Sequence, residues 1–145
     1  MDMKQAIKAA GVAAPSPGAS FFDAAGNLRL EFVDKQHMDP LARQLQNDGL
    51  TMSQLRRFFN HCRGIERRLR SHETLWEHEH GHVAKLSAYA ADALAKKKIP
   101  ASFRQFIDNN VARTQTGTDF VEGLMEHFEA LVGFAALYLK EERTR

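Results

Sequence analysis

The sequence predicts an all-α protein, a compact bundle of about five helices with a small N-terminal β-hairpin as an optional addition. Three observations support this fold class. Apolar residues recur every three or four positions through most of the chain after residue 40. Proline, glycine and capping residues divide that pattern into segments of helical length. With 145 residues, of which 43% are hydrophobic, the chain suits one domain with a substantial core.

Residues 1–20 are expected to form a flexible lead-in to a single helical domain that spans residues 21–145. A short helix is predicted from Met3 to Ala10, and the proline- and glycine-rich stretch at 15–18 ends it. This part of the chain has no long apolar segment of the kind that secretory signals contain. It therefore predicts neither export nor a contribution to the core.

Composition points to a cytoplasmic protein. No run of eighteen apolar residues occurs, so neither a membrane span nor a membrane partner is expected. The single cysteine, Cys62, cannot form an internal disulfide. Its apolar neighbours predict a buried thiol, which suits a reducing compartment.

Two short elements are predicted before residue 50. Residues 21–33 contain the only strand-like alternation in the chain, and Gly26 and Asn27 are suited to the turn of a hairpin. The next segment, Pro40 to Asp48, is predicted to be a short helix, because Asp39 can cap it and proline suits its first position.

The helix predicted from Leu50 to Arg70 has the strongest start signal in the chain. Thr51 and Gln54 have the spacing of a capping box, and Leu50 and Leu55 are placed to close over it as a hydrophobic staple. At about 100° per residue, the apolar residues that fall on one side of this helix are Leu55, Phe58, Phe59, Cys62, Ile65 and Leu69.

Positive charge is concentrated on the same helix. The net charge is +5 between Leu50 and His72 and −3 over the rest of the chain. The arginines form a stripe along one edge of the apolar face (Arg56, Arg63, Arg67, Arg70) or point away from the core (Arg57, Arg68). We expect no acidic partner at i,i+4 along the stripe, so its charges repel one another and favour a polyanion such as a phosphate backbone. A helix that is merely solvated is the alternative.

A histidine-rich segment, SHETLWEHEHGH at 71–82, follows the basic helix and is expected to be an exposed connector. His78, Glu79 and His82 match the H-E-x-x-H pattern of zinc hydrolases, in which a glutamate between two histidine ligands acts as general base. Gly81 lies inside that pattern, and such short matches arise easily in a segment rich in His and Glu. A catalytic zinc site is therefore kept only as an alternative, and no metal ligand is assigned.

Three further helices are predicted. The first runs from Val83 to Lys98, the second is short and contains Phe103 and Val111, and the last runs from about Thr118 to Glu142. Lys85 and Tyr89 share one face of the first of these helices, where Tyr89 can make a subunit contact or a phosphate or base contact.

Two apolar residues of the last helix, Phe134 and Leu137, fall outside its wide apolar arc. We interpret them as subunit contacts. The sequence contains no P-loop, no dinucleotide-binding glycine pattern and no recognisable nucleophile triad. It therefore assigns no catalytic residue and no cofactor.

Three segments together resemble the small-subunit family of the type III-A CRISPR effector, the Csm complex. The first is LTMSQLRRFFN at 50–60, continuing through Arg63, Ile65 and Glu66; the second is KLSAYAA at 85–91; the third is FEALVGF at 128–134. They occur in the order typical of that family and cover roughly residues 40–140. This combination is more specific than any one of the segments.

The resemblance implies a helical, non-catalytic RNA-binding protein that associates with itself in several copies along a guide RNA/target RNA filament. It also implies contacts with other subunits of the Csm complex, which would hold the catalytic centres. Within the matching segments, Arg56, Arg57, Arg63 and Lys85 occupy basic positions suited to RNA. Arg67 and Arg70 are added because they extend the same stripe.

Glu66 also matches, but it falls within the apolar arc, so it is expected to be a buried charge paired locally. A purely structural assembly subunit remains a further alternative.

Overall fold

The computed structural model describes residues 19–140. The predicted helix at Met3–Ala10, most of the predicted lead-in and the last residues of the predicted final helix lie outside this range. Within it, the elements are η1 (Leu30–Phe32), α2 (Lys35–Asn47), α3 (Met52–Arg70), α4 (Trp76–Ala84), α5 (Leu86–Ala95), α6 (Ala101–Arg113), the π-helical turn η2 (Asp119–Leu124) and α7 (Met125–Ala135). The predicted all-α bundle is confirmed.

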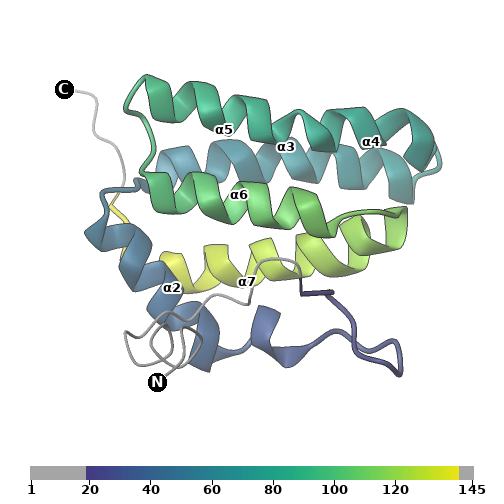
Figure 1. The fold of residues 1–145 in the computed structure, drawn as a ribbon, viewed down its shortest axis with the longest axis horizontal. Helices are drawn as coiled ribbons and strands as arrows, with labels where there is room; N and C mark the ends of the chain where they lie inside the picture. The colour runs from purple at the N-terminus through teal and green to yellow at the C-terminus, as the bar shows by residue number, and fades with distance from the viewer. Residues whose placement is uncertain (1–18, 141–145) are drawn as a thin grey trace.

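The helices pack side by side (Figure 1), and the buried residues of the described chain form one apolar core. α7 contacts α2 on one side and α3 on another, while α5 packs against α6. α4 and α5 follow one another along α3. The centre of the core holds a cluster of aromatic rings, contributed by Phe58, Phe59, Phe103, Phe106 and Phe128. None of the helices in residues 19–140 combines the length and apolarity that a membrane crossing requires.

The predicted hairpin is reduced to one antiparallel bridge between Phe22 and Leu28. Gly26, at φ +86°, makes the turn as expected. The predicted alternation then fails, because Leu30 begins a 3₁₀ turn and is 72% exposed. Two strands this short cannot hold each other without further strands beside them.

The segment before α2 is instead held by single contacts to the bundle. The Phe21 ring lies against Gly123 in η2, where an added Cβ would lie only 2.6 Å from two ring carbons. The buried Arg113 donates from Nε to the carbonyl oxygen of Ala19 at 3.0 Å. Nδ1 of the buried His127 lies 2.6 Å from the carbonyl oxygen of Phe32, so it carries the hydrogen and donates it.

α2 begins five residues earlier than predicted. Its cap is Asp34, whose side chain accepts a hydrogen bond from the His37 amide at 3.0 Å, and Asp39 lies inside the helix. Pro40 is also inside it. The proline removes only the hydrogen bond to the carbonyl of Gln36, an exposed residue, so the helix continues through it.

The histidine-rich segment was predicted to be an exposed connector, and this prediction is wrong. The segment forms most of α4. Glu79 and Val83, four residues apart, are both buried and fix this helix on the bundle. The helix predicted from Val83 to Lys98 is accordingly divided at Lys85, which ends α4 and precedes α5.

The last helix starts within one residue of the predicted position but ends earlier than predicted. Thr116 and Asp119 cap it reciprocally: the Thr116 hydroxyl accepts from the Asp119 amide, and the Asp119 carboxylate accepts from the Thr116 amide. η2 and α7 then continue to Ala135, where a turn replaces the predicted last turns.

Candidate nucleic-acid interface

α3 is a rigid platform whose underside is sealed in the core. The Thr51 hydroxyl accepts a hydrogen bond from the Gln54 amide at 3.3 Å, which confirms half of the predicted capping box. Gln54 also lines a groove toward α5. Of the predicted apolar face, Leu69 is half-buried and the other members are buried. Burial raises the pKa of the Cys62 thiol to about 12, so this cysteine is inert.

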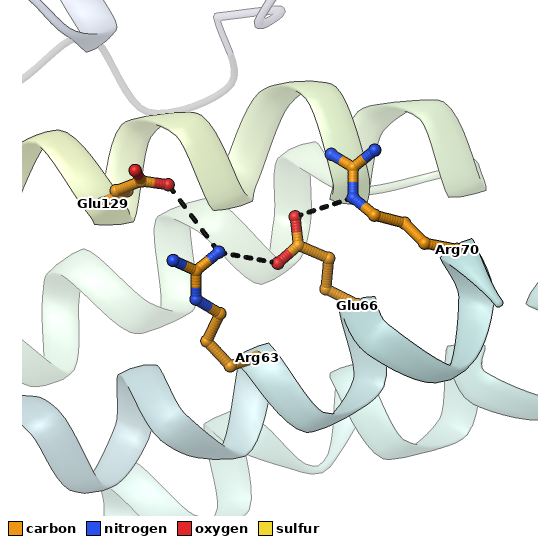
Figure 2. Close-up of polar contacts among 4 residues, drawn as sticks. All are labelled: Arg63, Glu66, Arg70 and Glu129. Atoms are coloured by element: carbon orange, nitrogen blue, oxygen red, sulfur yellow. Dashed lines mark hydrogen bonds and ion pairs between the residues drawn. The ribbon is translucent and has the colours of Figure 1, made fainter.

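The arginines of α3 do not form the predicted stripe without acidic partners. On the edge that faces α7, Glu66 is buried between two of them (Figure 2). Arg63 donates from Nη1 to Oε1 of Glu66 at 3.0 Å, and Arg70 donates from Nε to Oε2 at 3.2 Å. The prediction of a locally paired, buried Glu66 is confirmed, and the prediction that the stripe lacks an i,i+4 acidic partner is wrong.

The reason is a property of side-chain reach. Glu66 points toward the core edge of the helix, yet the long arginine side chains at i−3 and i+4 bend over to satisfy its carboxylate. Nη1 of Arg63 also lies 3.8 Å from Oε2 of Glu129 on α7. The guanidinium of Arg63 additionally covers the Phe59 ring, with Cζ 5.1 Å from the ring centroid.

This cluster of Arg63, Glu66, Arg70 and Glu129 still presents donors outward. Within the described part of the chain, Nη2 of Arg63 and both terminal nitrogens of Arg70 make no hydrogen bond. The side chains of Arg63 and Arg70 are 46% and 58% exposed. A guanidinium has five N–H donors, so each can hold Glu66 and still meet an anion.

Arg68 points to α4. The prediction that it points away from the core is therefore wrong. Its Nε and Nη2 donate to the two carboxylate oxygens of Glu79 at 2.7 and 2.9 Å, and Thr74 donates to the same carboxylate. The hydrogen bonds from Arg68 hold the pKa of Glu79 at about 2. This pair ties α3 to α4 and takes Arg68 out of the basic surface.

The outer face of α3 carries the remaining arginines. Arg56, Arg57 and Arg67 are exposed there. Neither Arg57 nor Arg67 has a carboxylate within ion-pairing distance among residues 19–140. Arg57 therefore carries uncompensated charge toward α5, where it lines a groove, and Arg67 carries it beside the partly neutralised cluster of Arg63 and Arg70 on the side of α7.

α5 places an aromatic side chain beside that face. Tyr89 is 45% exposed, and its ring meets the ring of His61 on α3 edge-on, with centroids 5.5 Å apart. Lys85 lies one helical turn earlier, is exposed, and accepts the Tyr89 amide hydrogen bond on its carbonyl. The i,i+4 hydrogen bond places Lys85 and Tyr89 one helical turn apart, which agrees with the predicted shared face.

A protein-family model described as Csm2 Type III-A matches residues 31–141, which is most of the chain. The chain belongs to the Csm2 type III-A family. The match extends the resemblance seen in the three sequence segments to the whole bundle from η1 onward. Searches of curated proteins and of solved structures found no match.

Membership of the Csm2 family makes this chain a small subunit of the type III-A CRISPR effector, the Csm complex, in which it associates with other subunits. In this Csm2 protein the H-E-x-x-H match has a different role from that in a zinc hydrolase. The Glu79 carboxylate is buried and engaged by Arg68 and Thr74, so it is not available as a general base. His78 and His82 lie exposed on α4.

The predicted subunit-contact residues of the Csm2 chain lie in different surroundings. Leu137 is 73% exposed, in the turn that follows α7. Phe134 is half-buried and packs against the core, so it offers only part of its ring to a partner. Tyr89 lies on α5, where its ring contacts His61 of α3.

Sequence reasoning missed the groove between α3 and α5. It encloses about 290 Å³ and is lined by Gln54, Arg57, Phe58, His61, Leu86, Tyr89, Asp92, Ala93 and Lys98. The signal in the sequence was the i,i+4 pair of Arg57 and His61, which puts a ring beside a guanidinium on one face. Which helix would face that pair could not be read from spacing alone.

Proposed function

We propose that this Csm2 protein is a non-catalytic RNA-binding subunit that associates in several copies along the guide RNA/target RNA filament of its complex. It holds RNA phosphates through the outer face of α3, with Arg56, Arg57 and Arg67 at the centre. Arg63, Arg70 and Lys85 extend that contact at its margins. Other subunits supply the chemistry of the complex.

One observation carries this proposal: α3, whose apolar face is buried in the core, exposes Arg57 and Arg67, and neither has a carboxylate within ion-pairing distance among residues 19–140. Arg68 is held by Glu79, but the other arginines of α3 keep exposed guanidinium groups, and positive charge gathered on one helix favours a polyanionic partner. Because α3 is capped and packed on α7, its exposed guanidiniums start from a fixed backbone, which lowers the entropy lost on binding.

The proposed contact is independent of base sequence. Guanidiniums that meet phosphates position a protein on RNA but carry no sequence information. Pairing between guide and target supplies the specificity, while the protein senses the backbone and the shape of the duplex. Repetition of the subunit along the filament multiplies a contact that is weak in one copy.

The first experiment is crosslinking of target RNA that contains 4-thiouridine in the assembled complex. The proposal expects crosslinked peptides from α3 and from the start of α5. A complex whose crosslinks all fall on other subunits would instead support a purely structural assembly role, with Leu137 among the contacts.

The second experiment measures the salt dependence of target RNA binding by the complex. Each lost phosphate contact should reduce the slope of log K against log salt by about 0.7 on single-stranded RNA. Arg57→Ala and Arg67→Ala are the test variants, and Arg104→Ala is the matched control, because Arg104 is an exposed arginine of α6 paired with Asp108. If the slopes of Arg57→Ala and Arg67→Ala equalled those of Arg104→Ala and of the unsubstituted protein, the proposal would be contradicted.

A further inference from the structure

The groove between α3 and α5 has an apolar floor and an aromatic wall. Phe58 and Leu86 are buried beneath it. Tyr89 forms one wall with 45% of its surface exposed, and the His61 ring stands edge-on to it. An exposed tyrosine ring that is fixed against a second ring costs little entropy to use as a contact surface.

The rim of this groove is basic. Arg57 lines it from α3, and Lys98 lines it from the turn after α5. Its one carboxylate, Asp92, lies 3.0 Å from Nζ of Lys96, so its charge is offset. The rim therefore favours an anionic group. The apolar floor favours a flat apolar group.

We propose that this groove receives one unpaired nucleobase of bound RNA, stacked on the Tyr89 ring, while Arg57 and Lys98 hold the phosphates on either side. The proposal rests on the RNA-binding function proposed above and adds a base contact to it. The Gln54 amide, also in the groove, offers a donor and an acceptor to the edge of the base.

Size and chemistry favour a base over a protein side chain. About 290 Å³ is at the lower edge of the roughly 300 to 1,000 Å³ of small-molecule pockets, which suits one planar ring system. Aromatic platforms bordered by positive charge are how proteins hold single-stranded nucleic acid without reading its sequence. A hydrophobic peptide would gain nothing from the two cations at the rim.

The test compares two probes on the full-length chain at low salt: a single-stranded oligouridylate and an abasic ribose-phosphate oligomer of the same length. Stacking on an aromatic side chain is worth a loss of about fivefold or more in affinity when the ring is removed. Tyr89→Leu should therefore weaken binding of the oligouridylate by at least that factor and leave binding of the abasic oligomer unchanged. Tyr89→Phe, which keeps the ring, should restore most of the affinity.

The outcomes separate this inference from the proposed function. Equal binding of both probes, with Tyr89→Leu silent and Arg57→Ala weakening both, would overturn the base site alone. No binding of either probe, in the free chain and in the assembled complex, would overturn the RNA-binding function with it. If the Tyr89→Leu chain no longer joined the assembled complex while its RNA affinity stayed unchanged, the groove would be a contact for a protein partner. That result would overturn the inference.

Discussion

Arg68 and Glu79 form a two-pronged ion pair in which the carboxylate is buried and the guanidinium is 39% exposed. The pair joins the last turn of the basic helix α3 to the histidine-rich helix α4, which contains the H-E-x-x-H match. Removing Arg68 leaves the buried Glu79 carboxylate without its main hydrogen-bond donor, which lowers the stability of the fold. This asymmetry makes the pair the most direct test of the structure.

Arg68→Ala should lower the free energy of unfolding by about 1 to 3 kcal/mol, because it leaves the Glu79 carboxylate buried without its main donor. Arg57→Ala is the matched control and should have little effect on stability, since Arg57 is exposed and has no carboxylate partner in residues 19–140. Chemical denaturation of both variants measures the difference. Equal stability would mean that the pair is not formed in solution.

Glu79 should also make stability depend on acid. Its pKa is about 2 in the folded chain against an ordinary 4.5, so the folded state resists protonation. The stabilisation is therefore complete above about pH 4.5 and is lost as the pH falls toward 2. Glu79→Gln should flatten the stability profile in that window, and an unchanged profile would contradict the assignment.

The buried His127 should make the stability of the fold depend on pH over a higher pH range than Glu79 does. Burial lowers its pKa to about 4 from 6.5, so the unfolded state binds the proton more readily. Stability should fall as the pH decreases from about 6.5 to 4, by about 3 kcal/mol at most. His127→Leu should remove this slope, at the cost of the hydrogen bond to Phe32. His78→Ala is the control, because His78 is exposed, and it should keep the slope.

Gly123→Ala should destabilise the fold by about 1 to 3 kcal/mol, because the new Cβ would meet the Phe21 ring at 2.6 Å. Gly133→Ala is a matched control on α7 with nothing within 4 Å of an added Cβ. Its expected effect is a gain of up to about 1 kcal/mol from helix propensity. If both substitutions behaved alike in thermal unfolding, the Phe21 contact would not be present.

Glu66→Gln should strengthen RNA binding while it weakens the fold. The substitution removes the negative charge that Arg63 and Arg70 share, so more positive charge reaches the surface. If one further guanidinium then meets a phosphate, the salt slope should steepen by about 0.7. The free energy of unfolding should fall by about 1 to 3 kcal/mol, because the polar contacts of a buried group are disturbed. Unchanged RNA affinity would show that this edge of α3 does not face RNA.

The parts of the fold that sequence predicted are those set by local signals. Thr51 caps α3 as its spacing indicated, and the apolar face below it is buried almost as expected. Periodicity and capping act within one or two turns of a helix, so they can be read without knowing the tertiary structure. The same reasoning found Glu66 as a paired, buried charge.

The errors came from contacts between distant residues. Arg68 was expected to point away from the core, but it binds Glu79 on the next helix. The segment that contains Glu79 was expected to be a connector, but it forms most of α4. Pro40 was read as a helix start because its neighbour can cap, whereas Asp34 caps earlier. Helical spacing fixes the direction of a side chain but not the partner that meets it.

The contact between Phe21 and Gly123 has a practical consequence for anyone who trims this chain. The family match begins at residue 31, yet the ring that fills the space over η2 and the carbonyl that holds Arg113 lie before it. A version cut at the family boundary would expose the apolar surface around Gly123 and remove one hydrogen bond of the buried Arg113. Recombinant work on the isolated subunit should therefore retain the chain from Ala19 onward.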